Sequence, residues 1–379
     1  MDMNTLGIYV QVPFCQTKCT YCNFYTGVVA RSLYRPYVDA VCREIAESRS
    51  LRGLTVDTVY LGGGTPSLLE PVDLRRVMDA IRRNYSCALE EVTLEADPET
   101  ISADKAAPWL DAGINRISMG VQSLNDQELR AVGRMHRRED VYHAIEFLRA
   151  AGFRNISMDL IAGLPHQTRN SWEWSLDELI AMRPEHVSIY LLEVDEGSRL
   201  GKELLAGGNK YGAPQVPSDD EMADFYELAC VKLKAQVFEH YEISNWALPG
   251  HASKHNLKYW RREPYVGFGA GSHSFDRQKR WANVHDPAVY ATAIQQGRSA
   301  IESVELVTSA QALDEELFLG LRELAGIDLP RIERKYGADL APRLAKLLDD
   351  GLIKRDGNTI RLNPAKLTIS NEVFVELLG

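Results

Sequence analysis

Two kinds of hydrophobic pattern alternate between residue 7 and about residue 195. Short apolar runs typical of buried strands are separated by longer stretches in which apolar residues recur every three or four positions, as in amphipathic helices. Strands joined by helices in this order predict right-handed βαβ units around a parallel sheet. The pattern alone does not distinguish an open doubly wound sheet from part of a β/α barrel. The predicted strands cover residues 7–12, 56–62, 91–96, 115–121, 155–163 and 186–194.

The sequence pattern of the second half of the chain changes at two places. Residues 201–218 are rich in Gly and Pro and are expected to form a loop or an insertion, and a long helix is expected over 219–236. From about residue 307 the pattern predicts three helices, a hairpin around Asp356-Gly357-Asn358 and a last helix. This order resembles a winged helix, a fold that often binds DNA. Residues 307–379 carry ten Lys and Arg against twelve Asp and Glu, so we expect a lid or packing domain instead of a DNA reader.

Polar or glycine-rich residues stand at the ends of nearly all the predicted strands. Ligands of parallel α/β folds gather at the carboxyl ends of the strands, where the βα loops meet. One carboxylate in such a place is usually a solvated loop residue, but repetition over six strands predicts a site. The residues concerned are the cysteine-rich loop after the first strand, residues 62–66 (GGGTP), Glu95, Asp97, Gln122, Asp159 and Glu193.

Three of the six cysteines lie within eight residues and form the spacing CxxxCxxC: Cys15, Cys19 and Cys22. Clustered thiols in a reducing cytosol indicate metal or redox chemistry. A structural zinc site needs four ligands, and the nearest histidine in sequence is His136. Zinc therefore remains an alternative only if a distant residue supplies the fourth ligand. A cubane [4Fe-4S] cluster on three thiolates leaves one iron open for a substrate or cofactor. Of the scattered cysteines, Cys42 and Cys230 are expected to be small buried hydrophobes, and Cys87 has no assigned role.

Composition and charge narrow the class of protein. The chain has 379 residues, 45% of them hydrophobic and 25% charged, which is ample for a large core. The net charge of −10 argues against a general nucleic-acid binder. The first 14 residues lack the basic and apolar regions of a secretory signal, and no run of about 18 uncharged apolar residues predicts a membrane span. We therefore expect a soluble cytoplasmic protein with no nucleic-acid partner.

The cysteine loop resembles that of the radical S-adenosylmethionine (SAM) superfamily, because Tyr21 precedes the last cysteine and GGGTP resembles the loop that receives the SAM amino group. The resemblance implies that SAM chelates the open iron and that an electron entering its sulfonium gives a 5′-deoxyadenosyl radical. A flavodoxin or ferredoxin is a candidate electron donor. The implied fold is α/β, an incomplete (β/α)6 TIM-like barrel with the cluster at its mouth and a helical, winged-helix-like C-terminal domain.

Over essentially the whole chain the resemblance narrows to the group of oxygen-independent coproporphyrinogen III oxidases (HemN) and HemW-type haem chaperones. Tyr9 lies six residues before Cys15, as in the family motif, although Gln11 replaces the usual His. The implied division is a core over 1–240, an extension over 241–306 and a HemN-type domain over 307–379. The residues that would line SAM by resemblance are Tyr9, Tyr21, Gly63, Gly64, Thr65, Glu95, Gln122, Arg134 and Asp159. Because the group can bind a second SAM, Gln122, Arg134 and Asp159 could serve that molecule instead.

Two features resemble the chaperone branch more than the oxidases. Phe24 stands where HemN-type oxidases usually carry a further cysteine, and HNxxYW at residues 255–260 precedes a glycine-rich run. The segments at 317–323 and 367–378 also match. The implied function is a haem-binding chaperone that delivers haem to an acceptor, with the cluster and SAM regulating or powering release. Membrane contact would occur only through that acceptor. The alternatives are the oxidase, which converts two propionates to vinyl groups, and, with less motif support, a haem-degrading methyltransferase.

A haem needs an apolar slot, stacking aromatic rings and an axial ligand, most often His. The HNxxYW segment could supply these, and His273 nearby is a second candidate ligand. On composition alone, hydrogen bonding of His255 in an ordinary core is the favoured interpretation, and the resemblance reverses that preference. The implied haem residues are His255, Asn256, Tyr259 and Trp260.

Overall fold

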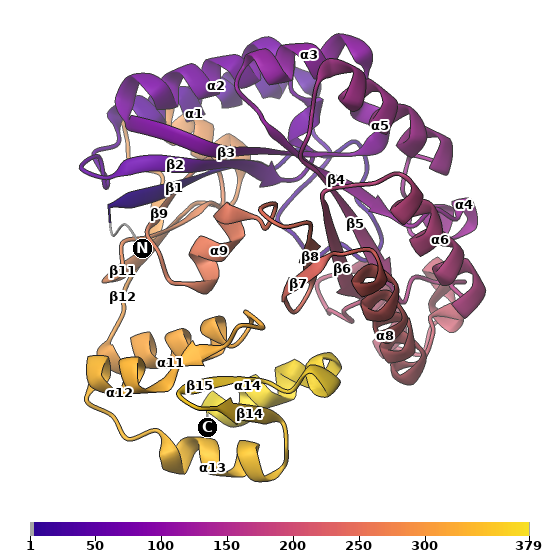
Figure 1. Ribbon diagram of the computed structural model, residues 1–379. Helices are drawn as coiled ribbons and strands as arrows, with labels where there is room; N and C mark the ends of the chain where they lie inside the picture. Colours follow the sequence, from indigo (N-terminus) through magenta and orange to yellow (C-terminus); the bar gives the residue numbers. More distant parts are fainter. Residues whose placement is uncertain (1–3, 379) are drawn as a thin grey trace.

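The computed structural model describes residues 4–378 and is built around one open sheet of twelve strands. Its centre is six parallel strands in chain order, with helices on the outer face of the curved sheet (Figure 1). The sheet does not close into a barrel, because β12 and β7 remain as its two edges. The central strands are β1 (Thr5–Val12), β2 (Thr55–Gly63), β3 (Ser86–Ala96), β4 (Arg116–Gln122), β5 (Ile156–Ala162) and β6 (His186–Leu191).

The connections between these strands follow the hydrophobic pattern. The central strands are buried on both faces for much of their length, which explains why they read as apolar runs. Pro71 stands at the start of α2, and Gly152 ends α5 with φ at 107°. The helices are α1 (Tyr34–Glu47), α2 (Pro71–Asn84), α3 (Ala103–Asp111), α4 (Asp126–Ala131), α5 (Arg138–Ala151) and α6 (Arg169–Ala181), with short 3-10 helices η1 (Arg31–Leu33), η2 (Pro66–Leu68) and η3 (Pro98–Thr100).

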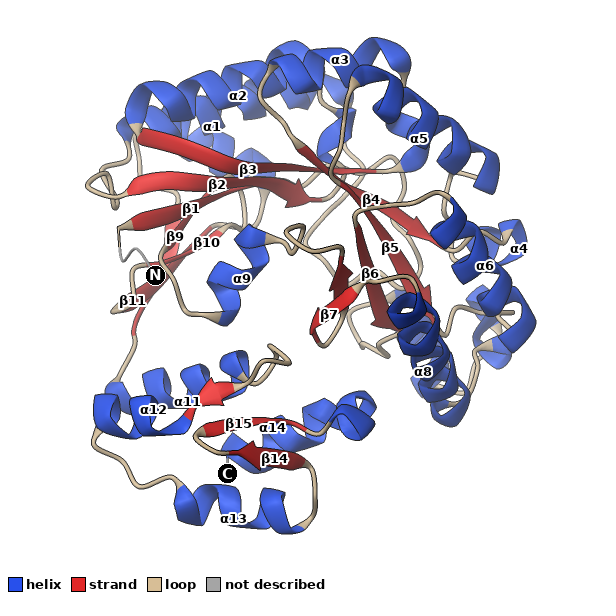
Figure 2. Cartoon of the chain, in the orientation of Figure 1, coloured by secondary structure: helices blue, strands red, loops and turns tan. Residues whose placement is uncertain are grey.

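Residues 239–306 extend the central sheet on both sides. β8 (Asn245–Ala247) pairs with β6 and with β7 (Glu239–Glu242), whereas β9 (Tyr265–Phe268) pairs in parallel with β1. Helix α9 (Lys254–Trp260) connects the two sides (Figure 2). The expectation of a loop over 201–218 is wrong in part, because α7 (Arg199–Leu205) and η4 (Lys210–Gln215) occupy it. The other elements are α8 (Asp219–Ala235), β10 (His273–Phe275), β11 (Lys279–Asn283), α10 (Pro287–Gln295) and β12 (Ile301–Leu306).

The C-terminal part is a separate, mainly helical layer with a three-stranded sheet (Figure 1). The predicted hairpin is present as the antiparallel pair β14 and β15, and β13 adds a third strand to it. The elements are α11 (Ser309–Gly320), β13 (Ile327–Asp328), α12 (Leu329–Tyr336), α13 (Ala341–Asp349), β14 (Ile353–Asp356), β15 (Thr359–Leu362), η5 (Pro364–Ile369) and α14 (Ser370–Leu378).

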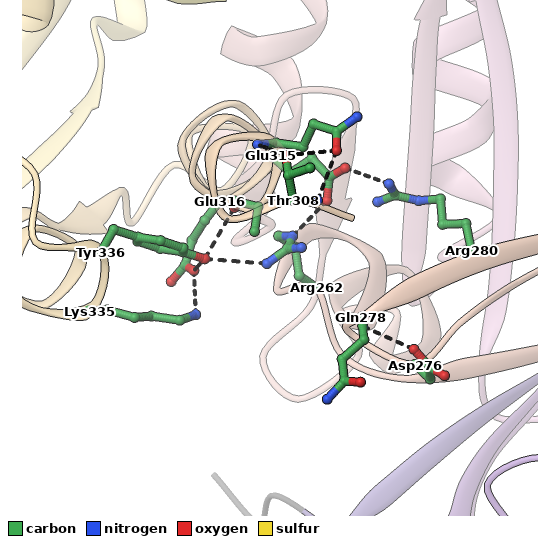
Figure 3. Close-up of polar contacts among 11 residues, drawn as sticks. Arg262, Asp276, Gln278, Arg280, Thr308, Glu315, Glu316, Lys335 and Tyr336 are labelled. Atoms are coloured by element: carbon green, nitrogen blue, oxygen red, sulfur yellow. Dashed lines mark hydrogen bonds and ion pairs between the residues drawn. The ribbon is translucent and has the colours of Figure 1, made fainter. Parts of the chain in front are cut away.

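A largely buried ionic cluster, here called the Glu315 clamp, joins this layer to the extended sheet (Figure 3). The carboxylate of Glu315 on α11 accepts hydrogen bonds from Arg262 Nε at 2.8 Å and from Arg280 Nη1 at 2.5 Å. Arg262 also approaches Tyr336 Oη at 3.4 Å, and the Tyr336 hydroxyl donates to Glu316 at 2.7 Å. The clamp therefore ties α11 and α12 to the loop after α9 and to β11.

Within the described residues, no helix combines the length and the apolar character needed to cross a membrane.

Candidate functional site

A cavity of about 510 Å³ lies at the carboxyl ends of the central strands and extends to the C-terminal layer. Its volume falls in the range of small-molecule sites. The predicted rim is therefore one continuous surface, although its residues come from six strands. The cavity is lined by the three clustered cysteines and by all but one of the residues predicted to contact SAM: Cys15, Cys19, Cys22, Tyr21, Gly63, Gly64, Thr65, Glu95, Gln122, Arg134 and Asp159.

The glycine loop after β2 packs directly on the backbone that leads into the cysteine loop. The amide of Gly64 donates to Val12 O at 2.9 Å, and the amide of Thr65 donates to Phe14 O at 2.7 Å. A Cβ atom built on Gly64 would stand 2.5 Å from Phe14 O. Glycine is therefore required here by close approach, and the two loops hold each other in place.

Substitution of Gly64 by Ala should separate these two loops. We expect a loss of about 1–3 kcal/mol in the free energy of unfolding, because the clash is with backbone and no flexible side chain can yield. Urea unfolding followed by circular dichroism measures this loss. Gly53→Ala is the matched control, because a Cβ atom there meets nothing within 4 Å. Equal stability of the two variants would contradict the proposed packing.

Arg134 connects the cysteine loop to the carboxylates of the rim. Its Nη1 lies 3.8 Å from Cys19 Sγ, and its Nη2 donates to Asp97 Oδ1 at 2.5 Å and to Gly120 O at 2.6 Å. Burial raises the pKa of the Cys19 thiol, and the Arg134 guanidinium counteracts that rise. Asp97 also accepts from the Thr65 hydroxyl at 2.9 Å. The sequence placed Asp97 at a strand end but did not identify it as the anchor of Arg134.

The donor set around the thiols suits an iron–sulfur cluster. The three cysteines are free and half-buried on one cavity wall. Burial raises the pKa of the Cys15 thiol, and thiolates are the usual ligands of iron–sulfur clusters. Between residues 4 and 378, no three His, Cys, Asp or Glu side chains converge closely enough to hold a single metal ion.

Glu95 stands at the end of β3, where it fixes the glycine loop. Its carboxylate accepts the amide of Gly63 at 2.8 Å and the hydroxyl of Tyr60 at 2.9 Å. Burial raises the pKa of Glu95 to about 7, although both hydrogen bonds favour the charged form. Glu95 is therefore a carboxyl group that changes charge near neutral pH inside the cavity.

This pKa shift predicts a pH-dependent stability difference between the wild type and Glu95→Gln. An acid whose pKa rises on folding stabilises the fold when protonated, and that contribution is lost as the pH rises from the usual value of 4.5 to about 7. Relative to the glutamine variant, the wild type should lose about 3 kcal/mol across this window. Urea unfolding of both proteins without added cofactors at several pH values measures it. A stability difference between the wild type and Glu95→Gln that does not change with pH would contradict the raised pKa of Glu95.

Tyr9 is the predicted SAM residue that does not line the cavity. Its ring stacks on Tyr60 with centroids 5.9 Å apart, and its hydroxyl donates to Gln11 at 2.9 Å. Tyr60 in turn donates to Glu95. Tyr9 therefore supports the rim from beneath, and direct contact with SAM remains a prediction.

The HNxxYW segment forms most of α9, and its histidine lies in the core. His255 Nδ1 is 2.9 Å from Thr58 Oγ1, and its Nε2 is 2.9 Å from Tyr259 Oη. Its backbone amide donates to Glu91 at 3.0 Å, and burial lowers its pKa to about 3. Binding to haem iron would require the ring to leave one of these partners, so this role stays a prediction. Asn256 lies in the first turn of α9, and Trp260 lies under Arg322.

Comparison with known proteins separates the HemW-type chaperones from the HemN-type oxidases as relatives of this chain. Residues 9–179 match the radical SAM superfamily, and residues 307–365 match the HemN C-terminal domain. The heme chaperone HemW of Bacillus subtilis is 35% identical over 378 residues, covering 98% of both chains. This chain belongs to the HemW family. The HemW proteins of Lactococcus lactis and Escherichia coli are 32% and 33% identical, over 98% and 71% of this chain.

The fold of the HemW-family chain is also that of a related oxidase. The structure of Escherichia coli coproporphyrinogen III oxidase (HemN), described as a radical SAM enzyme, matches with a TM-score of 0.85 and 23% identity, over 99% of this chain and 90% of that one. The predicted α/β radical SAM fold with a helical C-terminal region is confirmed, and the sheet is mixed and open.

Sequence reasoning predicted a lid or packing domain for the C-terminal layer but did not identify which of its residues line the cavity. Motif matching in the HemW-family chain pointed to segments 317–323 and 367–378 but gave their residues no role. The structure brings both to the cavity wall, and no periodicity signal could have paired them with strand ends more than 100 residues away. The residues concerned are Arg322, Leu367, Thr368, Ser370 and Asn371.

Proposed function

We propose that this protein is a haem chaperone that binds haem and transfers it to an acceptor protein. The observation that carries the proposal is the full-length similarity to proteins named heme chaperone HemW. Phe24 supports it, because it occupies the place of the further cysteine of the oxidases on the loop beside the cavity.

We further propose that Cys15, Cys19 and Cys22 hold a [4Fe-4S] cluster with SAM beside it. When bound, the cluster would supply a low-potential electron to SAM. The chain's own residues then bind and orient SAM. The glycine loop offers backbone amides as hydrogen-bond donors, and the Glu95 carboxylate accepts hydrogen bonds at the rim. Arg134 stays charged against Asp97 and faces the sulfur of Cys19.

The cellular location, the electron donor, the domain division and the haem residues are also part of the proposal. We place the protein in the cytoplasm, with a flavodoxin or ferredoxin as the electron donor and with membrane contact only through an acceptor. The division into a core, an extension and a C-terminal domain at residues 240/241 and 306/307 remains our working division. The haem residues proposed from the family motif are His255, Asn256, Tyr259 and Trp260.

An anaerobic experiment tests the proposal. The cluster is reconstituted, haem is titrated, and coproporphyrinogen III is incubated separately with SAM and a reductant. Stoichiometric haem binding without protoporphyrinogen supports the chaperone, whereas turnover to protoporphyrinogen would establish the oxidase instead. Full haem binding by a folded His255→Ala variant would remove His255 as the iron ligand.

A further inference from the structure

The cavity carries an excess of carboxylates, and its cations differ in what they already bind. Lys18 Nζ donates to Phe24 O at 3.2 Å, and Arg134 is held by Asp97 and a backbone carbonyl. Arg322 makes a single looser contact, with its Nη2 3.5 Å from Glu242 Oε2. The guanidinium of Arg322 therefore keeps donors available at the cavity wall, since its side chain is 24% exposed.

The Arg322 guanidinium stands over the tryptophan of the HNxxYW segment. The central carbon of the Arg322 guanidinium lies 4.4 Å from the centroid of the Trp260 ring, a cation–π arrangement. Within residues 4–378, the Arg322 Nε and the Trp260 Nε1 are both buried without a hydrogen-bond partner. Arg322 lines the cavity, and buried N–H groups without partners are unusual in folded proteins.

The backbone around Arg322 is fixed as well. Its carbonyl accepts the amide of Ile243 at 3.2 Å, and Leu324 N donates to Tyr241 O at 3.0 Å. Glu242 between them is fully buried and accepts the amide of Ser244 at 3.1 Å. The segment after α11 is therefore attached to the edge of the large sheet, which holds the backbone that carries Arg322.

We propose that Arg322 binds a carboxylate of the ligand held in this cavity and that Trp260 is its positioning residue. The inference rests on the proposed function and goes beyond it by placing one of the two propionates of haem, an iron tetrapyrrole, at this end of the cavity. A planar guanidinium with free N–H groups matches a carboxylate in a bidentate geometry that lysine cannot reproduce. Hydroxyl and amide groups of Ser244, Ser370 and Asn371 line the same cavity. Trp260 of the HNxxYW motif thus contributes to haem binding by positioning Arg322 against a propionate, whichever residue ligates the iron.

The test compares haem with its dimethyl ester, in which both propionates are blocked, on the reconstituted full chain. Wild type should bind haem about 10- to 100-fold more tightly than the ester, the range expected for one charged hydrogen-bonded pair. Arg322→Gln should remove most of this preference by weakening haem binding and leaving ester binding unchanged. Arg322→Lys keeps the charge beside Glu242 and should retain only part of the preference for haem over the ester.

Trp260 variants and a control complete the test. Trp260→Phe keeps a ring under the guanidinium and should retain the preference, whereas Trp260→Leu should reduce it. Arg298→Gln is the control, an exposed arginine outside the cavity. Equal wild-type affinity for haem and ester, or equal loss of both in Arg322→Gln, would overturn the inference while leaving haem binding intact. Absence of haem binding by the wild type would overturn the proposed function and this inference with it.

Discussion

Replacing any one of Cys15, Cys19 and Cys22 by alanine is expected to abolish stable iron binding after anaerobic reconstitution. Each thiolate would ligate one iron, and no other thiol lines the cavity within the described part of the chain. Bound iron should fall from about four per chain to less than one, with loss of the cluster's visible absorption and of SAM binding. Iron analysis and absorbance measure the first two effects, and equilibrium dialysis with SAM measures the third.

The scattered cysteines provide matched controls for this prediction. Cys42 and Cys230 are partly buried against the main core on α1 and α8, and Cys87 lies on β3. Their alanine variants should keep the full iron content, and only a modest loss of stability is expected. Wild-type iron content in a Cys19→Ala variant would contradict the predicted ligand set, and so would iron loss in Cys230→Ala.

Substitution of Glu315 by Ala is expected to lower the free energy of unfolding by about 3 kcal/mol, because it leaves Arg262 buried without its carboxylate. Arg262 has a side-chain exposure of 7%, and Glu315 of 14%. Burial alone would raise the pKa of Glu315, but hydrogen bonds from Arg280 and Arg262 lower it below its usual value. The stabilisation is therefore present above about pH 4.5 and is lost as the pH falls through the lowered pKa.

Chemical unfolding of the wild type, Glu315→Ala, Arg280→Ala and the double variant isolates the interaction. The two single losses should be non-additive, because both substitutions break the same contact. Glu302→Ala is the control, an exposed glutamate on β12, and should change stability by less than about 0.5 kcal/mol. A Glu315→Ala variant as stable as this control would show that the clamp does not hold the C-terminal layer.

The sequence predicted the local parts of the site better than its distant parts. The central strands, the glycine stop at Gly152 and the hairpin at 353–362 depend on neighbouring residues, and the pattern predicts them correctly. Family resemblance supplied the residues that would contact SAM, and the structure gathers all but Tyr9 on one cavity wall. The open form of the sheet did not follow from periodicity, because periodicity is the same in open and closed arrangements.

The unpredicted features depend on contacts between residues far apart in the chain. Composition favours a hydrogen-bonded core position for His255, but its partners Thr58 and Glu91, about 200 and 160 residues earlier, are identified only by the structure. The sequence pattern gives Arg322 no role, and only the structure places Trp260 and Glu242 beside it. Such pairings are set by tertiary packing, which single-sequence patterns do not encode.

The pairing of β1 with β9 has a consequence for how the chain is made. β1 is complete at Val12, but its partner on one side begins only at Tyr265. At about 5–20 residues per second, the ribosome needs roughly 15 to 50 s to supply that partner. During this time the first strand, directly before the cysteine loop, has one open edge that can pair with another chain. Slow production of soluble protein, with aggregation of nascent chains that lack residues beyond about 260, is the outcome to expect.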